Sequence, residues 1–85
     1  MAYKLLIVED EKEKATGIAY LTGKYNPECR PVLLAHDGRE GYEKATAEQP
    51  DIIVTDIRMP EMDGLEMIRE LKKAGCSAEF IVLSG

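Results

Sequence analysis

The sequence has 85 residues, of which 45% are hydrophobic and 32% charged, and its formal net charge is −5. This length allows one small domain, and the composition is that of an ordinary globular protein. The acidic balance argues against a surface that grips a nucleic-acid backbone. Apolar runs such as Leu5 to Val8 are too short to cross a bilayer, and no signal peptide is visible, so we expect a cytoplasmic chain.

The first part of the chain has the pattern of a strand, a helix and a second strand. Residues 3–8 are a short apolar run that ends in acidic residues, as in a buried parallel strand. Residues 12–25 carry small and apolar side chains on one helical face, namely Ala15, Ile18, Ala19, Thr22 and Tyr25. Asn26-Pro27 ends this helix, and residues 31–35 are the second strand candidate.

The next segment predicts a capped helix and a third strand. Asp37 and Glu40 have the spacing of a capping box. The helix that they open should run to about Glu48, with Tyr42 and Ala45 turned inward. Residues 51–55 are rich in β-branched side chains and predict a third strand, which leads into Asp56.

A loop over 57–64, a third helix and a fourth strand complete the pattern. The helix should cover about 65–74, with Leu65, Ile68 and Leu71 on one side, and Gly75 is its expected C-terminal stop. Residues 79–83 predict the fourth strand. Strands that alternate with helices in this way require a parallel sheet with helices on its faces, joined by right-handed crossovers. We therefore expect an α/β fold in a single unit that spans residues 1–85.

Polar side chains follow three of the predicted strands. Glu9 and Asp10 follow the first strand, Asp56 ends the third and Ser84 follows the fourth. Ligands of open parallel sheets bind at the carboxyl ends of the strands. Carboxylates that meet there repel one another, and a divalent cation relieves the repulsion. Mg²⁺ is the expected ion because it prefers oxygen ligands and is often bound together with phosphate. The alternative for each acidic residue alone is a helix cap or a turn former.

Two stretches resemble the receiver domain of two-component response regulators. They are Val-Glu-Asp-Glu at 8–11 and Ile-Ile-Val-Thr-Asp-Ile-Arg-Met-Pro-Glu-Met-Asp-Gly at 52–64. Ala-His-Asp-Gly-Arg-Glu at 35–40 and Ile-Val-Leu-Ser-Gly at 81–85 also match in type and position. The resemblance covers the whole chain and implies a flavodoxin-like open parallel sheet.

The resemblance also implies a role for each matching residue. Asp56 corresponds to the phosphoacceptor, and Asp10 to a direct Mg²⁺ ligand with Glu9 as its acidic neighbour, which acts mostly through water. The backbone carbonyl of Arg58 corresponds to a third protein ligand of the metal, and Ser84 to the hydroxyl residue that moves toward the phosphoryl group. The implied donor is a phosphohistidine on a sensor histidine kinase. Such a chain is modified on its own aspartate and is not a turnover enzyme.

The loop after the acceptor matches the family as well. Pro60 and Gly64 correspond to the residues that shape it, by fixing the backbone and by permitting a turn respectively.

The sequence departs from the family after its fourth strand. The family continues with a helix, a fifth strand that ends in a lysine, and a final helix, so the present chain matches a partial receiver domain. Lys72 and Lys73 belong to the third predicted helix and cannot take that lysine's role by pattern. We therefore expect phosphotransfer by these 85 residues alone to be impaired. We also expect them to self-associate through the fourth strand, which becomes a sheet edge.

Two other functions compete with the phosphoacceptor. One is a non-catalytic structural fragment or half-domain that self-associates. The other is an aspartyl phosphohydrolase, which is disfavoured because Arg58 stands where that chemistry usually places a general acid. Cys29 and Cys76 lack metal-site spacing and are expected to be free thiols. His36 is expected at the surface, and residues 11–14 alternate in charge like a solvated helix start.

Overall fold

The computed structural model describes residues 2–83 and has seven elements in alternating order. They are β1 (Tyr3–Val8), α1 (Lys12–Tyr25), β2 (Cys29–Ala35), α2 (Gly38–Glu48), β3 (Ile52–Asp56), α3 (Gly64–Lys73) and β4 (Glu79–Leu83). The predicted order of elements is confirmed, and the predicted bounds differ from these by no more than two residues.

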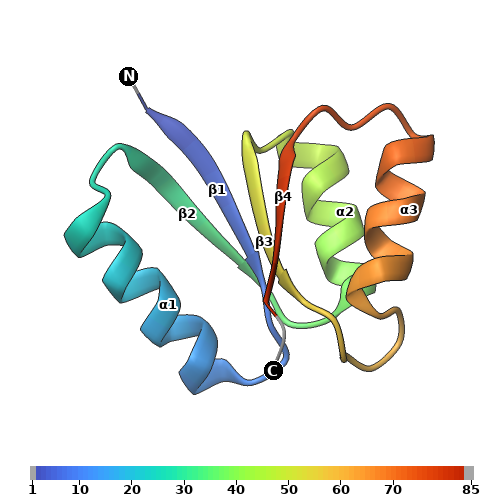
Figure 1. Ribbon diagram of the computed structural model, residues 1–85, viewed down its shortest axis with the longest axis horizontal. Coiled ribbons are helices and arrows are strands. Elements are labelled where there is room, and N and C mark those ends of the chain that lie inside the picture. The colour runs from blue at the N-terminus through green and yellow to red at the C-terminus, as the bar shows by residue number, and fades with distance from the viewer. Residues whose placement is uncertain (1, 84–85) are drawn as a thin grey trace.

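The four strands form one parallel sheet in the order β2-β1-β3-β4. Helix α1 lies on one face of the sheet, and α2 and α3 lie side by side on the other (Figure 1). The expected α/β architecture is therefore confirmed, and the first and third strands are neighbours in the sheet. Among residues 2–83, no helix combines the length and the apolar character needed to span a membrane.

The main core lies between the sheet and the pair α2 and α3. Alternate residues of the central strands, such as Leu6, Val8 and Ile53, point to this layer, where Met67 and Leu71 of α3 meet them. All five side chains are nearly inaccessible to water. Burial of an apolar side chain of this size contributes about 1.5–3 kcal/mol, so this layer fixes α3 relative to β1 and β3.

Three details of the sequence-based prediction were wrong. Tyr25 was expected on the inward face of the first helix, but it is 69% exposed as the last residue of α1. Leu65 is 51% exposed, and Met67 takes the inward place in the first half of α3. The second strand begins at Cys29 and not at Pro31. Pro31 is tolerated there because β2 is an edge strand with an irregular register at this point.

The start of α2 confirms the predicted cap and modifies it. Asp37 Oδ1 accepts a hydrogen bond from the backbone N–H of Glu40 at 2.8 Å. Glu40 Oε1 accepts from the N–H of His36 at 2.7 Å, one residue before the cap. His36 is half-buried, so it is less exposed than the surface position that the sequence predicts.

Asp51 precedes β3 and forms hydrogen bonds with the N-terminal ends of β1 and β4. Its carboxylate accepts from the N–H of Lys4, and its own N–H donates to the Lys4 carbonyl, both at 2.8 Å. Its carbonyl oxygen accepts from the N–H of Glu79 at 2.9 Å. Hydrogen bonds therefore join the N-terminal ends of β1, β3 and β4. The candidate site residues lie at the opposite, carboxyl ends of the strands.

Candidate metal centre

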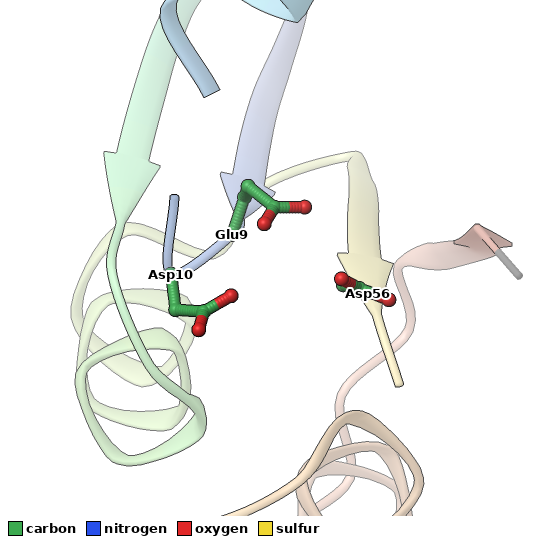
Figure 2. Close-up of side chains that lie close together, drawn as sticks. All are labelled: Glu9, Asp10 and Asp56. Carbon is green, nitrogen blue, oxygen red and sulfur yellow. The ribbon is translucent and has the colours of Figure 1, made fainter. Parts of the chain in front are cut away.

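Three carboxylates meet at the carboxyl ends of β1 and β3. Glu9 and Asp10 follow β1 directly, Asp56 is the last residue of β3, and the parallel pairing brings these strand ends together. One carboxylate oxygen from each residue lies within 4.8 Å of the others. Figure 2 shows the three side chains around a common space, with Asp56 facing the other two from its neighbouring strand. The predicted convergence of Glu9, Asp10 and Asp56 is confirmed.

Glu9 is a buried carboxylate that is only half satisfied. Its side chain is 1% exposed, and its Oε2 accepts a hydrogen bond from the N–H of Glu11 at 3.2 Å. Its Oε1 is buried without a hydrogen-bond partner. Burial raises the pKa of the Glu9 carboxyl above its ordinary value, although the Glu11 N–H and the Lys14 ammonium oppose the rise. The charge of Asp56 adds to it.

Asp56 presents two oxygens with different roles. Its Oδ1 accepts a hydrogen bond from the N–H of Ile57 at 2.7 Å, which fixes the side chain at the strand end. Its Oδ2 lies 3.8 Å from the ammonium of Lys14 and is the oxygen that faces a cation. A carboxylate held through one oxygen keeps the other for a metal ion or for attack on an electrophile.

The loop from Asp56 to α3 is shaped by close backbone contacts. The N–H of Gly64 donates to the carbonyl of Ile57 at 2.8 Å, which closes the loop. A Cβ at Gly64 would overlap the carbonyl oxygen of Asp56, so only glycine allows α3 to begin there. The expected shaping role of Gly64 therefore has a steric cause. Asp63 completes the turn, since its Oδ1 accepts from the N–H of Glu66 at 2.8 Å.

Lys14 is the residue of this site that the sequence reasoning missed. Its ammonium lies 3.6 Å from Glu9 Oε1 and 3.8 Å from Asp56 Oδ2. The alternating charges of residues 11–14 predict a solvated helix start, and all four residues are exposed, but this pattern does not indicate that Lys14 pairs with Glu9 and Asp56. A usable signal existed, because α1 begins at the sheet edge where β1 ends, so a long side chain in its first turns can reach that edge.

The donor set fits a hard divalent cation. Carboxylate oxygens are the ligands that Mg²⁺ takes in proteins, usually one or two of them together with waters and phosphate. Glu9 Oε1 fits such a site as well, because this buried oxygen accepts no hydrogen bond and has only the ion pair with the Lys14 ammonium, 3.6 Å away, to offset its burial.

The two remaining candidates from the sequence have different outcomes. Arg58 lies in the loop directly after β3, two residues beyond Asp56, and the role of its carbonyl stays a prediction. Ser84 lies outside the described residues 2–83. Cys29 and Cys76 are both free thiols and half-buried, as expected.

Relatives of known sequence cover nearly the whole chain. The chain is 40% identical over 83 residues to the uncharacterized transcriptional regulatory protein YesN of Bacillus subtilis, which covers 98% of this chain and 23% of that protein. It is 36% identical over 84 residues to the alkaline phosphatase synthesis transcriptional regulatory protein PhoP of the same organism, covering 99% of this chain and 34% of that protein. The chain thus spans a quarter to a third of the length of these relatives.

Solved structures agree with this. The N-terminal domain of an uncharacterized protein from Wolinella succinogenes matches with a TM-score of 0.89 at 38% identity, over 99% of this chain and 65% of that one. The receiver domain of the Francisella response regulator 1452 matches with a TM-score of 0.88 at 28% identity, over 96% and 65%. The sequence profile of the response regulator receiver domain matches residues 5–85. The chain belongs to the receiver domain family of two-component response regulators.

Proposed function

We propose that the chain accepts a phosphoryl group on Asp56 with the help of Mg²⁺. The observation that carries the proposal is the convergence of Glu9, Asp10 and Asp56 within 4.8 Å, with one oxygen of Asp56 fixed by the backbone. Asp10, Asp56 and the Arg58 carbonyl would hold the ion, and Glu9 would support it, mostly through water. When bound, the ion supplies charge neutralisation for the phosphoryl oxygens.

The side chains then have simple tasks. The free oxygen of Asp56 attacks phosphorus, a bond forms between this oxygen and phosphorus, and the bond from phosphorus to the donor atom breaks. The hydrogen bond from Ile57 to Oδ1 keeps the attacking oxygen directed at the site. The product is an acyl phosphate on the chain itself, so the proposal describes a modified signalling module and not a turnover enzyme.

The proposed donor is a phosphohistidine of a sensor histidine kinase. This partner follows from family membership, since receiver domains are the phosphoryl acceptors of two-component systems. A kinase that is loaded from a nucleoside triphosphate works in the cytoplasm, which is the location that we propose. For the 85 residues alone we expect slow transfer, because they do not include the family's lysine that contacts the phosphoryl group. By analogy with the loss of an oxyanion-hole donor, the loss of one such charge-assisted contact costs about 2–4 kcal/mol.

Chemical phosphorylation tests the proposal. The chain is incubated with acetyl phosphate and Mg²⁺, and the gain of one phosphoryl group is followed by intact mass, with hydroxylamine release as proof of an acyl phosphate. We expect modification of the wild type, none of Asp56→Asn, and much slower modification of Asp10→Asn. Asp51→Asn, at the other end of β3, is the matched control and should behave as wild type. Modification of Asp56→Asn would refute the assignment.

A second candidate function is self-association, and the observation that favours it is the position of β4 at the edge of the described sheet. Ile81 and Val82 are 50% and 41% exposed on this edge strand. An exposed apolar strand edge is a template for pairing with another copy. We propose that the isolated 85-residue chain self-associates there.

Static light scattering tests the self-association at high micromolar concentration. Ile81→Lys should shift the chain toward monomer. Leu65→Lys should not, because Leu65 is 51% exposed on a helix and not on a sheet edge. A wild type that is monomeric under these conditions would contradict the proposal.

A further inference from the structure

A lysine lies between two of the three clustered carboxylates. Lys14 lies in the first part of α1, and its ammonium is 3.6 Å from Glu9 Oε1 and 3.8 Å from Asp56 Oδ2. These two oxygens come from different strands, so the ammonium bridges β1 and β3 across the acidic site. Its side chain is 39% exposed, which leaves it a path toward solvent.

The two ion pairs of Lys14 offset the negative charge of Glu9 and Asp56. Glu9 Oε1 is buried and accepts no hydrogen bond, and the Asp56 carboxylate lies close by. Buried or crowded carboxylates need an opposite charge nearby. The ammonium of Lys14 supplies one positive charge to both carboxylates at once, so in the metal-free chain it performs part of the task of a divalent cation.

We propose that Lys14 is a positioning residue that acts as a tethered cation and competes with Mg²⁺ for Glu9 and Asp56. This inference rests on the proposed function, because it concerns the same ion. Asp10 and Asp56 would hold the ion with Glu9 in support, and its double positive charge would repel the nearby ammonium of Lys14. The flexible four-carbon stem of Lys14 then moves the ammonium outward. Lys14 therefore weakens Mg²⁺ binding and sets the concentration at which the site fills.

The size of the effect follows from Coulomb's law. A single and a double charge about 5 Å apart in a medium close to water repel by about 1.7 kcal/mol, which is somewhat more than tenfold in affinity. The ion pairs that Lys14 gives up add to this cost, and movement of the ammonium into solvent reduces it. We expect removal of the charge to tighten Mg²⁺ binding by about tenfold.

The test is a Mg²⁺ titration of the isotope-labelled chain, followed by the amide resonances of residues 9–11 and 56–58, which reports affinity without any phosphotransfer. Lys14→Met removes the charge and keeps the length of the side chain. Lys14→Gln also removes the charge but keeps a hydrogen-bond donor for Glu9, in case the methionine variant does not fold. Lys14→Arg keeps the charge.

Lys12→Met is the matched control. Lys12 is exposed in the same first turn, and it forms no ion pair among residues 2–83. It therefore reports the loss of one distant, screened charge.

We expect Lys14→Met and Lys14→Gln to bind Mg²⁺ about tenfold more tightly than wild type, with Lys14→Arg and Lys12→Met within about twofold of it. Equal or weaker binding by both neutral variants, with normal binding by wild type, would overturn this inference and leave the proposed function intact. The same holds if Lys12→Met tightens binding as much as Lys14→Met. Absence of Mg²⁺ binding in every form would overturn the proposed metal site itself.

Discussion

Gly64 shows how a single residue controls the backbone geometry around Asp56. Its Cα lies so near the end of β3 that a methyl group would overlap the carbonyl oxygen of Asp56. The atoms in conflict belong to the backbone and cannot rotate away, unlike the end of a flexible side chain. The loop must therefore shift if any other residue stands there, and the end of β3 shifts with it.

We predict that Gly64→Ala destabilises the chain by about 1–3 kcal/mol or more, the usual cost of overpacking. Gly17→Ala is the control, because Gly17 lies within α1 and a methyl group added to it would have no neighbouring atom within 4 Å. It should gain about 0.5–1 kcal/mol from the better helix propensity of alanine. Urea denaturation measures both changes, and equal stabilities of the two variants would contradict the steric argument.

The three helices begin in two different ways. Asp37 and Asp63 each accept a hydrogen bond from the backbone N–H three residues later, and so cap α2 and α3. Glu11 stands at the same position of α1, but its side chain forms no such bond. Its own N–H instead donates to the Glu9 carboxylate, one of the three clustered carboxylates. Glu11 thus does not cap α1 with its side chain, and its backbone N–H binds Glu9.

Removal of a cap tests this difference. Asp37→Ala should cost about 1 kcal/mol of unfolding free energy, the typical loss for a capping aspartate. Glu11→Ala should cost much less, because no capping bond is lost and the backbone N–H remains. Urea denaturation at neutral pH measures both, and a larger loss for Glu11→Ala would show that its side chain has a role not described above.

Glu40 links the stability of α2 to pH. The hydrogen bond from the His36 N–H, aided by Lys44, lowers the pKa of the Glu40 carboxyl below its ordinary value of 4.5. The folded state therefore holds this proton less tightly than the unfolded state does. Its contribution to stability is fully present above pH 4.5 and is lost as the pH falls through the lowered pKa.

We accordingly expect the stability difference between wild type and Glu40→Gln to be largest near neutral pH and to shrink in acid below pH 4.5. Glu43→Gln, exposed on the same helix, is the control and should leave the difference from wild type nearly constant. Urea denaturation at two pH values measures these differences in unfolding free energy. A difference between wild type and Glu40→Gln that grows in acid would contradict the lowered pKa of Glu40.

The elements were predictable from the sequence because their signals are local. Apolar runs mark the strands, and Asp37 with Glu40 marks the start of α2. The acidic cluster was predictable as well, since parallel strands place their carboxyl ends at one edge. The inward places of α3 were assigned partly to the wrong side chain, because Leu65 and Met67 are both apolar and only the packing against β1 and β3 separates them.

Lys14 was not predictable in the same way. Charge alternation describes only the neighbours of Lys14 in sequence, whereas its partner Asp56 lies on a strand 42 residues later. The pairing depends on the approach of α1 to the sheet edge, which is a tertiary property. The bond from the His36 N–H to Glu40 likewise depends on how the end of β2 meets α2.

At the scale of the whole molecule, a bound cation should stabilise the fold. Glu9 and Asp10 follow β1, and Asp56 ends β3, so an ion that contacts both segments binds only the folded chain. At a Mg²⁺ concentration ten times the dissociation constant, linkage gives about 1.4 kcal/mol. For a domain of this size that corresponds to a rise in Tm of roughly 5–10 °C.

Thermal unfolding followed by circular dichroism measures this rise, with sodium chloride at matched ionic strength as the reference. Asp10→Asn should lose most of the shift, and EDTA should reverse it in wild type. A Tm of wild type that does not change with Mg²⁺ would contradict a cation site formed by these two strands.

The bonds of Asp51 at the beginning of the strands have a mechanical consequence. They anchor β1, β3 and β4 to one another at a fixed end, so these strands cannot slide past each other there. If Asp56 is phosphorylated as proposed, a register shift at this end of the sheet would have to break these bonds. We therefore expect the response in the segments that leave the opposite ends of β1 and β3, residues 9–11 and 57–63.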